Sequence, residues 1–301
     1  MAMKVIDFIF AARPMLFLPV WSIFLLTYHT ISPAEPLPPS AFAKLISVSL
    51  MTAGIYYINQ YFDYQTDLIN RKLGFLQKGF ISHREIIAAY LSVSILAFII
   101  SLFVEAVFAL LVGIVFVFGY FYSAPPLRFK DRPVAGLLAN MVGYGLALPL
   151  SLANDIITVN PRLIALAFYF SLVVGATFLL TIIPDRPGDA AARKQTAAQF
   201  ISDSALLSIS SALVTLAAGL MFAFEIYPLA VVTLAALALY LMTLIFRNRA
   251  FLLFSCKFPI LLVSVLAGWY FPGYLVFILV LMAASRLYYK KRFGISYPRL
   301  N

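Results

Sequence analysis

The chain has 301 residues, of which 63% are hydrophobic and 11% are charged, and its mean hydropathy is +0.97. These values exclude a soluble domain and indicate an integral membrane protein. The net charge of +10 does not indicate nucleic-acid binding, because the basic residues lie in short segments between apolar runs and report membrane topology. A single cysteine, Cys256, excludes a disulfide framework and a thiolate metal site.

Ten apolar spans follow one another, each about 20 residues long and bounded by charge or proline. The first follows Lys4 and Arg13 without a small-residue cleavage pattern, so we expect a retained helix and not a signal peptide. The sequence therefore predicts an all-α fold, a polytopic integral membrane bundle of nine to ten transmembrane helices that forms a single domain over residues 1–301. The spans cover residues 14–31, 41–62, 85–103, 106–123, 134–153, 162–183, 204–224, 227–246, 251–270 and 271–289.

The number of spans depends on residues 271–289, which only Phe271-Pro272-Gly273 separates from the preceding span. With a cytoplasmic N-terminus and ten spans, 20 of the 22 Lys and Arg residues lie inside, and only Lys44 and Arg162 lie outside. With nine spans, the cluster Lys290-Lys291-Arg292 would lie outside. We therefore expect an additional C-terminal helix and a multi-pass protein of the cell membrane. Two acidic motifs, described next, are expected on the cytoplasmic side.

The first acidic motif ends the second span, where Asn59, Asp63 and Asp67 follow one another at intervals of four residues. At that spacing the three side chains share one face of a helix. Two carboxylates about one turn apart repel each other unless a cation lies between them, and a divalent cation with oxygen ligands is the usual solution. The alternative is that these acids cap a loop or pair with Arg71 and Lys72, but acidic residues at a membrane boundary are usually functional.

The second acidic motif, Asp185 and Asp189, follows the sixth span. We expect Pro187 and Gly188 to break the helix between them and to form a turn that holds both carboxylates toward one centre. Two acidic pairs on one membrane face predict one shared metal site. Magnesium binds through a few carboxylates plus phosphate oxygens, so we expect Mg²⁺ with a diphosphate ligand.

The loop after the fourth span, from Tyr122 to Arg132, carries three cations that face the same compartment as the acidic motifs. Its Ala124-Pro125-Pro126 segment is stiff enough to present Arg128 and Lys130 to a phosphate. The alternative is that these cations mark topology only. Four carboxylates and nearby cations at the mouth of an apolar bundle indicate a site for a magnesium-bound diphosphate on a lipid tail, and the chemistry that fits is loss of the diphosphate.

In their order and on one membrane face, these motifs resemble the UbiA superfamily of intramembrane prenyltransferases over roughly residues 10 to 270. The resemblance implies a helical bundle around a central cavity, in which both acidic motifs bind an isoprenoid diphosphate through magnesium. It implies that Asn59 supports the first metal cluster and that the four carboxylates ligate metal. The segments that carry it are Asn59-x-x-x-Asp63-x-x-x-Asp67, Tyr122-Ser-Ala-Pro-Pro-Leu-Arg128-Phe-Lys130 and Asp185-x-x-Gly188-Asp189.

The sequence also departs from the family pattern. Members often carry a segment rich in proline and arginine after the first motif, where this chain has residues 70–82, and basic residues after the second, where it has Ala190, Ala191 and Ala192. Members are also generally described with nine spans. These departures leave the acidic residues intact but bear on the identity of the acceptor.

The predicted function is magnesium-dependent transfer of a prenyl group from a polyisoprenyl diphosphate to an aromatic or other lipid-precursor acceptor, through an allylic carbocation and with release of diphosphate. The expected partners are the isoprenyl diphosphate donor, an apolar or aromatic acceptor and the lipid bilayer. The residues fall into three predicted roles: catalytic and metal-binding Asp63, Asp67, Asp185 and Asp189, with Asn59 at the metal; diphosphate-binding Arg128, Lys130, Lys72, Arg71 and Lys194; and acceptor-binding Arg13, Tyr122 and Asn140.

Two other functions stay open. An ion-coupled membrane transporter also uses membrane acids, but transporters usually place them near the midplane on broken helices, whereas both motifs here lie at one boundary. An inactive isoprenoid-binding membrane protein is the second alternative, because of the three alanines after the second motif. Magnesium-dependent release of diphosphate would separate all three hypotheses.

Overall fold

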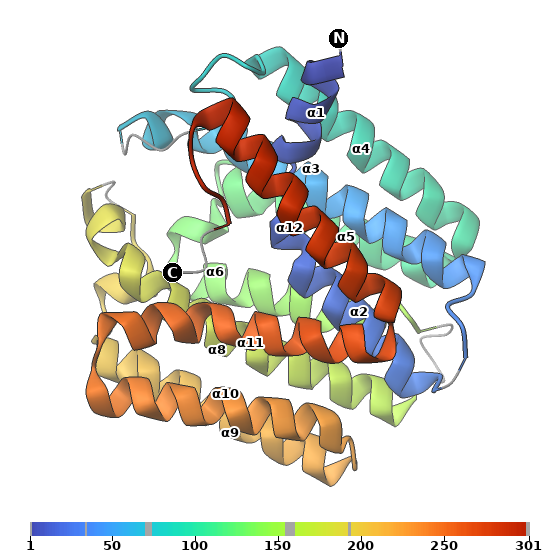
Figure 1. Ribbon diagram of the computed structural model, residues 1–301, viewed down its shortest axis with the longest axis vertical. Helices are drawn as coiled ribbons and strands as arrows, with labels where there is room; N and C mark the ends of the chain where they lie inside the picture. Colours follow the sequence, from blue (N-terminus) through green and yellow to red (C-terminus); the bar gives the residue numbers. More distant parts are fainter. Residues whose placement is uncertain (1, 34, 70–73, 154–159, 192–193, 299–301) are drawn as a thin grey trace.

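The computed structural model describes residues 2–33, 35–69, 74–153, 160–191 and 194–298, and folds them into one helical bundle (Figure 1). In chain order its elements are α1 (Ala2–Ala11), η1 (Pro14–Phe17), α2 (Leu18–Ile31), α3 (Pro39–Ile69), α4 (His83–Val104), α5 (Ala106–Ser123), η2 (Phe129–Asp131), α6 (Pro133–Asn140), η3 (Met141–Ala147), α7 (Leu148–Leu150), α8 (Pro161–Ala191), η4 (Ala197–Gln199), α9 (Asp203–Ala223), α10 (Tyr227–Phe246), α11 (Arg249–Tyr270) and α12 (Pro272–Phe293).

Ten helices within the described part of the chain are long and apolar enough to cross a membrane, which confirms the ten predicted spans. The first covers Met3–Ile31 and combines α1, η1 and α2, so it begins earlier than the predicted residue 14. The last is α12, which confirms the additional C-terminal helix. The single-domain organisation and the side of the membrane that each end faces stay predictions.

Two helices, α3 and α8, are longer than a membrane requires, with 31 residues each. At a rise of about 1.5 Å per residue each spans roughly 46 Å, whereas the hydrocarbon core is about 30 Å thick. The excess turns carry the two acidic motifs. Both pairs of carboxylates can therefore lie outside the hydrocarbon while remaining on continuous helices.

The buried helix α2 lies at the centre of the bundle and packs against α3, α8 and α11. On one side of it α3, α4 and α5 pack together, and on the other side α8, α9, α10 and α11 do so. Helix α12 begins beside the end of α11 and runs diagonally across the bundle to α1 (Figure 1). The first and last helices of the chain thus meet at one end of the molecule.

The fifth span is irregular, because the α-helix α6 continues as the π-helical segment η3 before α7. Short π-helical segments inside membrane helices are frequent at functional sites. Gly145 lets this segment approach α8 closely, since a Cβ atom at this position would lie 2.2 Å from Ser171 Cα. The change in helical pitch sets which side chains of the fifth span face the interior.

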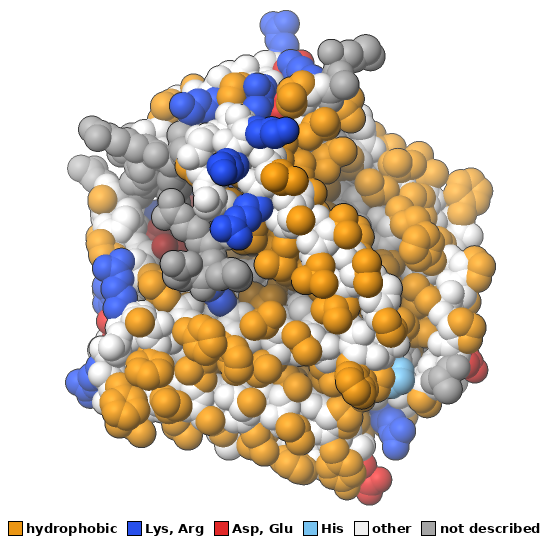
Figure 2. Space-filling model, in the orientation of Figure 1, with side chains coloured by type: hydrophobic (Ala, Val, Ile, Leu, Met, Phe, Trp, Pro, Cys, Tyr) orange, Lys and Arg blue, Asp and Glu red, His pale blue; other side chains and the backbone are white. Residues whose placement is uncertain are grey.

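The surface of the bundle separates charge from apolar side chains (Figure 2). Lys and Arg side chains gather over the upper and left parts of the view, around the end of α12, while hydrophobic side chains cover most of its lower and right parts. This distribution is typical of a helical bundle whose flanks contact lipid.

Candidate active site

The first acidic motif lies on the last turns of α3, as the sequence predicted. The Asn59 amide donates a hydrogen bond to Ser123 Oγ at 3.1 Å, and Asp63 Oδ1 lies 2.5 Å from Lys130 Nζ. The Lys130 ammonium also donates to Ser123 Oγ at 3.4 Å, and Asp67 follows one turn later on the same helix. Ser123, which sequence reasoning did not assign, therefore connects the motif to the loop that follows α5.

Lys130, and not Arg128, is the cation of this loop that contacts the first acidic motif. Arg128 adopts a left-handed backbone conformation with φ 41°, and its Nε atom pairs with Asp131 Oδ2 at 2.7 Å. Its side chain is 35% exposed, whereas that of Lys130 is 8% exposed. Burial lowers the pKa of Lys130, although Asp63 opposes this by favouring the charged ammonium. Of the two loop cations predicted to bind diphosphate, Lys130 lies at the acidic motif and Arg128 turns away from it.

The turn predicted between Asp185 and Asp189 is wrong, because α8 continues through Pro187 and Gly188 to Ala191. A proline removes one helix hydrogen bond and can bend a helix without ending it. Because the helix continues, the two carboxylates are four residues apart on a helix and share one face. The second motif therefore has the same spacing and helical setting as Asp63 and Asp67.

Contacts from the segment after α8 hold these last turns in place. The Arg186 guanidinium donates to the Ile201 carbonyl at 2.8 Å and pairs with Asp203 at 2.5 Å. In return, the Gln199 amide donates to the Arg186 carbonyl at 3.0 Å. These long-range bonds stabilise a helical end that proline and glycine would otherwise disfavour.

Asp189 lies beside two donors of the segment that follows it. Lys194 Nζ is 3.5 Å from Asp189 Oδ1, and Thr196 Oγ1 donates to Asp189 Oδ2 at 3.3 Å. The positive charge of Lys194 also disfavours protonation of Lys130. The other predicted diphosphate ligands, Arg71 and Lys72, lie outside the described residues.

The donor set fits a magnesium ion shared with a phosphate ligand. Among the described residues no group of three or more His, Cys, Asp or Glu side chains could enclose a metal. Magnesium in proteins needs only one or two carboxylates, with phosphate oxygens and waters completing its shell. Each motif offers two carboxylates on one helical face, and Asp63 already binds a cation, the Lys130 ammonium. That both pairs serve one shared site stays a prediction.

The three residues predicted to bind the acceptor line one cavity of about 230 Å³, which we name the polar cavity after them, although most of its surface is apolar. Arg13 comes from the break between α1 and η1, Tyr122 from α5 and Asn140 from the end of α6. The Asn140 amide donates to Tyr122 Oη at 3.3 Å, and Asn59 of the first motif also lines the cavity. The structure thus brings these residues together beside the first acidic motif, while their role stays a prediction.

Two apolar cavities adjoin the polar one at a pair of tyrosines that sequence reasoning missed. Tyr144 lines all three cavities, Tyr56 lines the polar cavity and one apolar cavity, and their hydroxyls lie 3.4 Å apart. Tyr144 follows Asn140 by one helical turn, a sequence signal that could have identified it. No local pattern singles out Tyr56, because its role depends on the packing of α3 against the fifth span.

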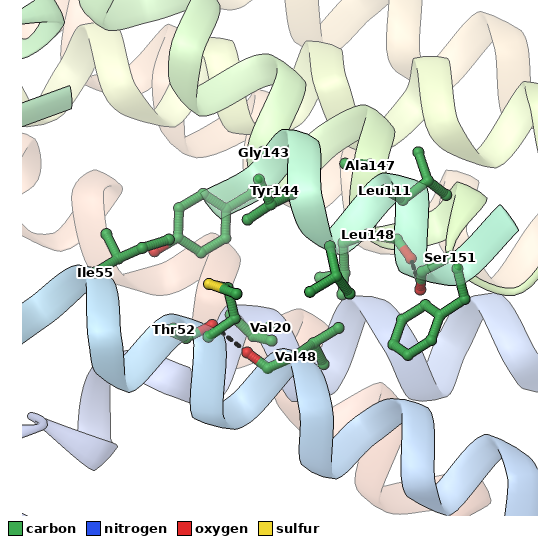
Figure 3. A pocket seen from close by; sticks show the side chains of 14 residues that line it. Val20, Val48, Thr52, Ile55, Leu111, Gly143, Tyr144, Ala147, Leu148 and Ser151 are labelled. Atoms are coloured by element: carbon green, nitrogen blue, oxygen red, sulfur yellow. Dashed lines mark hydrogen bonds between the residues drawn. The ribbon is translucent and has the colours of Figure 1, made fainter. Parts of the chain in front are cut away.

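We name the two apolar cavities by the helices that line them. The α2–α8–α11 cavity, about 320 Å³, reaches Thr181, one turn before Asp185. The α3–α5 cavity, about 70 Å³, is lined by residues of α3 from Ile55 back to Val48 and by Leu148 (Figure 3). Gly143 lies where the α3–α5 cavity meets the polar one, and a Cβ atom there would have no neighbour within 4 Å.

The walls of the α3–α5 cavity suit a hydrocarbon. Two of its three hydroxyl side chains are already bound to the backbone, since Thr52 donates to the Val48 carbonyl at 2.7 Å and Ser151 donates to the Leu148 carbonyl at 2.5 Å (Figure 3). The remaining side chains around it are aliphatic or aromatic, apart from Tyr144. A ligand in this cavity therefore gains contact with apolar surface and needs no polar group.

Comparisons with known proteins agree with this geometry. A family model described as the UbiA prenyltransferase family matches residues 15–251. A UbiA homolog from Archaeoglobus fulgidus bound to GPP and Mg²⁺ has a similar structure, with 20% identity, a TM-score of 0.69, and coverage of 88% of this chain and 99% of that chain. The structure of a digeranylgeranylglyceryl phosphate synthase is 18% identical, with a TM-score of 0.68 and coverage of 90% and 98%.

A UbiA homolog from Aeropyrum pernix K1 is similar as well, at 16% identity, a TM-score of 0.61, and coverage of 85% of this chain and 97% of that chain. At these identities the likeness concerns the fold. A search of curated proteins found no match. The family match ends at residue 251, so it leaves out nearly all of α11 and the whole of α12.

Proposed function

Because the chain belongs to the UbiA prenyltransferase family, we propose that it transfers a prenyl group from an isoprenyl diphosphate to a second, lipid-precursor molecule in a Mg²⁺-dependent reaction. The observation that carries this proposal is the contact between Asp63 and Lys130 beside a polar cavity that continues into apolar ones. Carboxylates with a metal ion and a buried ammonium bind the diphosphate head of such a lipid, and an apolar channel holds its tail.

The bound diphosphate meets the two acidic motifs and the cations between them. Asp63, Asp67, Asp185 and Asp189 hold the metal, with Asn59 beside the first pair. When bound, Mg²⁺ neutralises the negative charge that develops on the departing diphosphate. Lys130 would donate its hydrogen bonds to the phosphate oxygens, and Lys194 would do the same from the second motif.

The reaction breaks the bond between the donor's first carbon and the diphosphate oxygen. The electron pair of this bond leaves with diphosphate, and the prenyl group becomes an allylic cation. The rings of Tyr56 and Tyr144, at the junction of the cavities, stabilise this cation through their π-electrons and exclude water. A nucleophilic carbon or oxygen of the acceptor then forms a bond to the same carbon and loses a proton.

The polar cavity binds the acceptor, and the apolar α3–α5 cavity binds the prenyl tail, for which it must widen beyond its volume of about 70 Å³. Arg13 attracts an anionic group of the acceptor, while Tyr122 and Asn140 hydrogen-bond its polar atoms. The tail passes Gly143, where the absence of a side chain leaves open space. The acceptor is an aromatic acid or another anionic lipid precursor, and both motifs face the cytoplasm in accordance with the charge distribution.

The test is a product screen with purified protein in detergent or lipid nanodiscs. Geranyl, farnesyl and geranylgeranyl diphosphate serve as donors, and 4-hydroxybenzoate, 1,4-dihydroxy-2-naphthoate, a porphyrin and geranylgeranylglyceryl phosphate serve as acceptors. Mass spectrometry should find an acceptor increased in mass by one prenyl group, with an equal amount of diphosphate released, and EDTA should abolish both. Glu225→Gln, at an exposed position away from the motifs, serves as the control variant and should remain active.

Each other outcome of this screen rejects the proposal. Donor binding without release of diphosphate would indicate an inactive binding protein. Neither donor binding nor release, together with ion-driven uptake into proteoliposomes, would indicate a transporter.

A further inference from the structure

The last helix joins the first through a buried carboxylate that the proposed reaction does not use. Asp7 of α1 is only 1% exposed. The Arg292 guanidinium binds both of its oxygens, with Nε 2.9 Å from Oδ1 and Nη2 2.7 Å from Oδ2. The Tyr288 hydroxyl donates a further hydrogen bond to Oδ1. Such a two-pronged, mostly buried ion pair fixes the orientation of the two helices more strictly than apolar packing does.

Aromatic packing reinforces this junction. The rings of Phe10 and Tyr288 are stacked with their centres 4.0 Å apart. The Arg292 guanidinium lies over the ring of Phe80, 3.5 Å from its centre. Stacked aromatic pairs and cation–π contacts each add to the attraction from buried area alone, so α12 holds α1 through polar and apolar contacts at once.

Tyr289, the residue of α12 that follows Tyr288, contacts the turn that contains Arg13. The Tyr289 hydroxyl donates to the Phe10 carbonyl oxygen at 3.2 Å, and the backbone amide of Arg13 donates to the same oxygen at 3.0 Å. Arg13 has φ 58°, in the left-handed region. A non-glycine residue adopts this conformation only where its surroundings impose it, and the shared carbonyl is one of the contacts that impose it.

Arg13 brings a positive charge to the wall of the polar cavity. It is the one charged residue among the described residues that line the three cavities. The segment after α12 covers the same region, because the ring of Tyr297 packs against that of Tyr289 with centres 4.8 Å apart. Burial raises the pKa of Tyr297, and the positive charge of Arg13 acts in the opposite direction.

We propose that α12, which lies outside the family match, sets the direction of the Arg13 side chain and that Tyr289 is the positioning residue that does so. The Asp7–Arg292 pair fixes α12 against α1, and Tyr289 fixes the carbonyl around which the Arg13 turn is built. The expected effect of Tyr289 on acceptor affinity rests on the proposed function. The expected effect of Tyr289 on the structure of the Arg13 turn is independent of the proposed function.

The first test compares Tyr289→Phe with Tyr274→Phe by hydrogen–deuterium exchange of the whole protein in nanodiscs. Tyr274 is a matched control, since it also lies on α12 and its hydroxyl also hydrogen-bonds another helix, at Ser22 and the Leu18 carbonyl. Exchange of the amides in residues 8–17 should rise about two- to tenfold in Tyr289→Phe, as expected for one lost hydrogen bond, and should stay unchanged in Tyr274→Phe. Unchanged exchange in Tyr289→Phe would overturn the proposal.

The second test measures kinetics with whichever of the four acceptors of the product screen gives product. Tyr289→Phe should raise the KM for this acceptor about two- to tenfold, with kcat and the donor KM unchanged. In an Arg13→Gln background the same change should have no further effect. An equal loss with and without Arg13 would show that Tyr289 supports the fold only, and would overturn the proposal. If the wild type turns over none of the four, the reaction scheme fails, but the exchange experiment still decides whether Tyr289 holds the Arg13 turn.

Discussion

Replacing Lys130 with methionine should have opposite effects on magnesium binding and on turnover. The methionine side chain fills a similar volume, but it removes the ammonium that lies 2.5 Å from Asp63 and 3.4 Å from Ser123. In the metal-free protein the Lys130 ammonium occupies Asp63 and competes with incoming magnesium, so the variant should bind Mg²⁺ more tightly. With the metal and donor bound, the variant lacks a hydrogen-bond donor to the leaving diphosphate.

The size of each effect follows from the burial of this pair. The side chains of Lys130 and Asp63 are 8% and 16% exposed, so solvent screens their interaction only weakly. A hydrogen bond to a charged group contributes about 1.5 to 3 kcal/mol, which corresponds to a roughly tenfold to hundredfold loss of turnover. We expect the loss in kcat if the contact strengthens as the carbon–oxygen bond breaks, and in donor KM if it holds the ground state only.

The assay pairs donor turnover with thermal stability measured over a magnesium titration. Arg128→Met is the matched control, because it removes a cation from the same loop. The Arg128 side chain is 35% exposed and is paired with Asp131. This control should change turnover by less than about threefold. Unchanged kcat, donor KM and magnesium dependence in Lys130→Met would refute the reasoning, and would leave this loop as a marker of membrane topology.

Three other predictions follow from the site and the spans. Asp63→Asn and Asp185→Asn should each abolish magnesium-dependent diphosphate release in a protein that retains its helical circular dichroism, and full activity of either variant would contradict a shared site. Gly143→Leu should weaken binding of geranylgeranyl diphosphate at least tenfold more than that of geranyl diphosphate, since the new side chain enters the α3–α5 cavity; equal losses in equilibrium binding would place the tail elsewhere. Reporters fused after Asn301 and inserted near Lys78 should both report a cytoplasmic location, and an external C-terminus would reverse the charge-based orientation.

The sequence predicted the spans and the first acidic motif well because both depend on local properties. Apolar length and flanking charge determine a membrane helix without reference to its neighbours, so even the separation of α11 from α12 could be predicted from Phe271-Pro272-Gly273. Likewise, intervals of four residues place Asn59, Asp63 and Asp67 on one face of any helix that contains them.

The failures concern features that depend on distant contacts. Proline and glycine favour a turn between Asp185 and Asp189, but Arg186 binds residues 15 and 17 positions later and stabilises the helix there. Composition alone does not distinguish Arg128 from Lys130, whereas a left-handed backbone turns Arg128 toward Asp131. For the same reason the role of Tyr289 could not be predicted, since the carbonyl to which it donates lies 279 residues earlier in the chain.

The prolines inside α8 give the two acidic motifs different mechanical properties. Pro184 and Pro187 have no amide hydrogen, so neither the Leu180 nor the Ile183 carbonyl receives the hydrogen bond that a regular helix would supply. No proline interrupts α3 after its first residue. Bending α8 just before its carboxylates therefore costs less energy than bending α3. When a diphosphate binds, we expect α8 to adjust its direction to the ligand while α3 keeps its position, so that one half of the site serves as a fixed reference and the other adapts to the substrate.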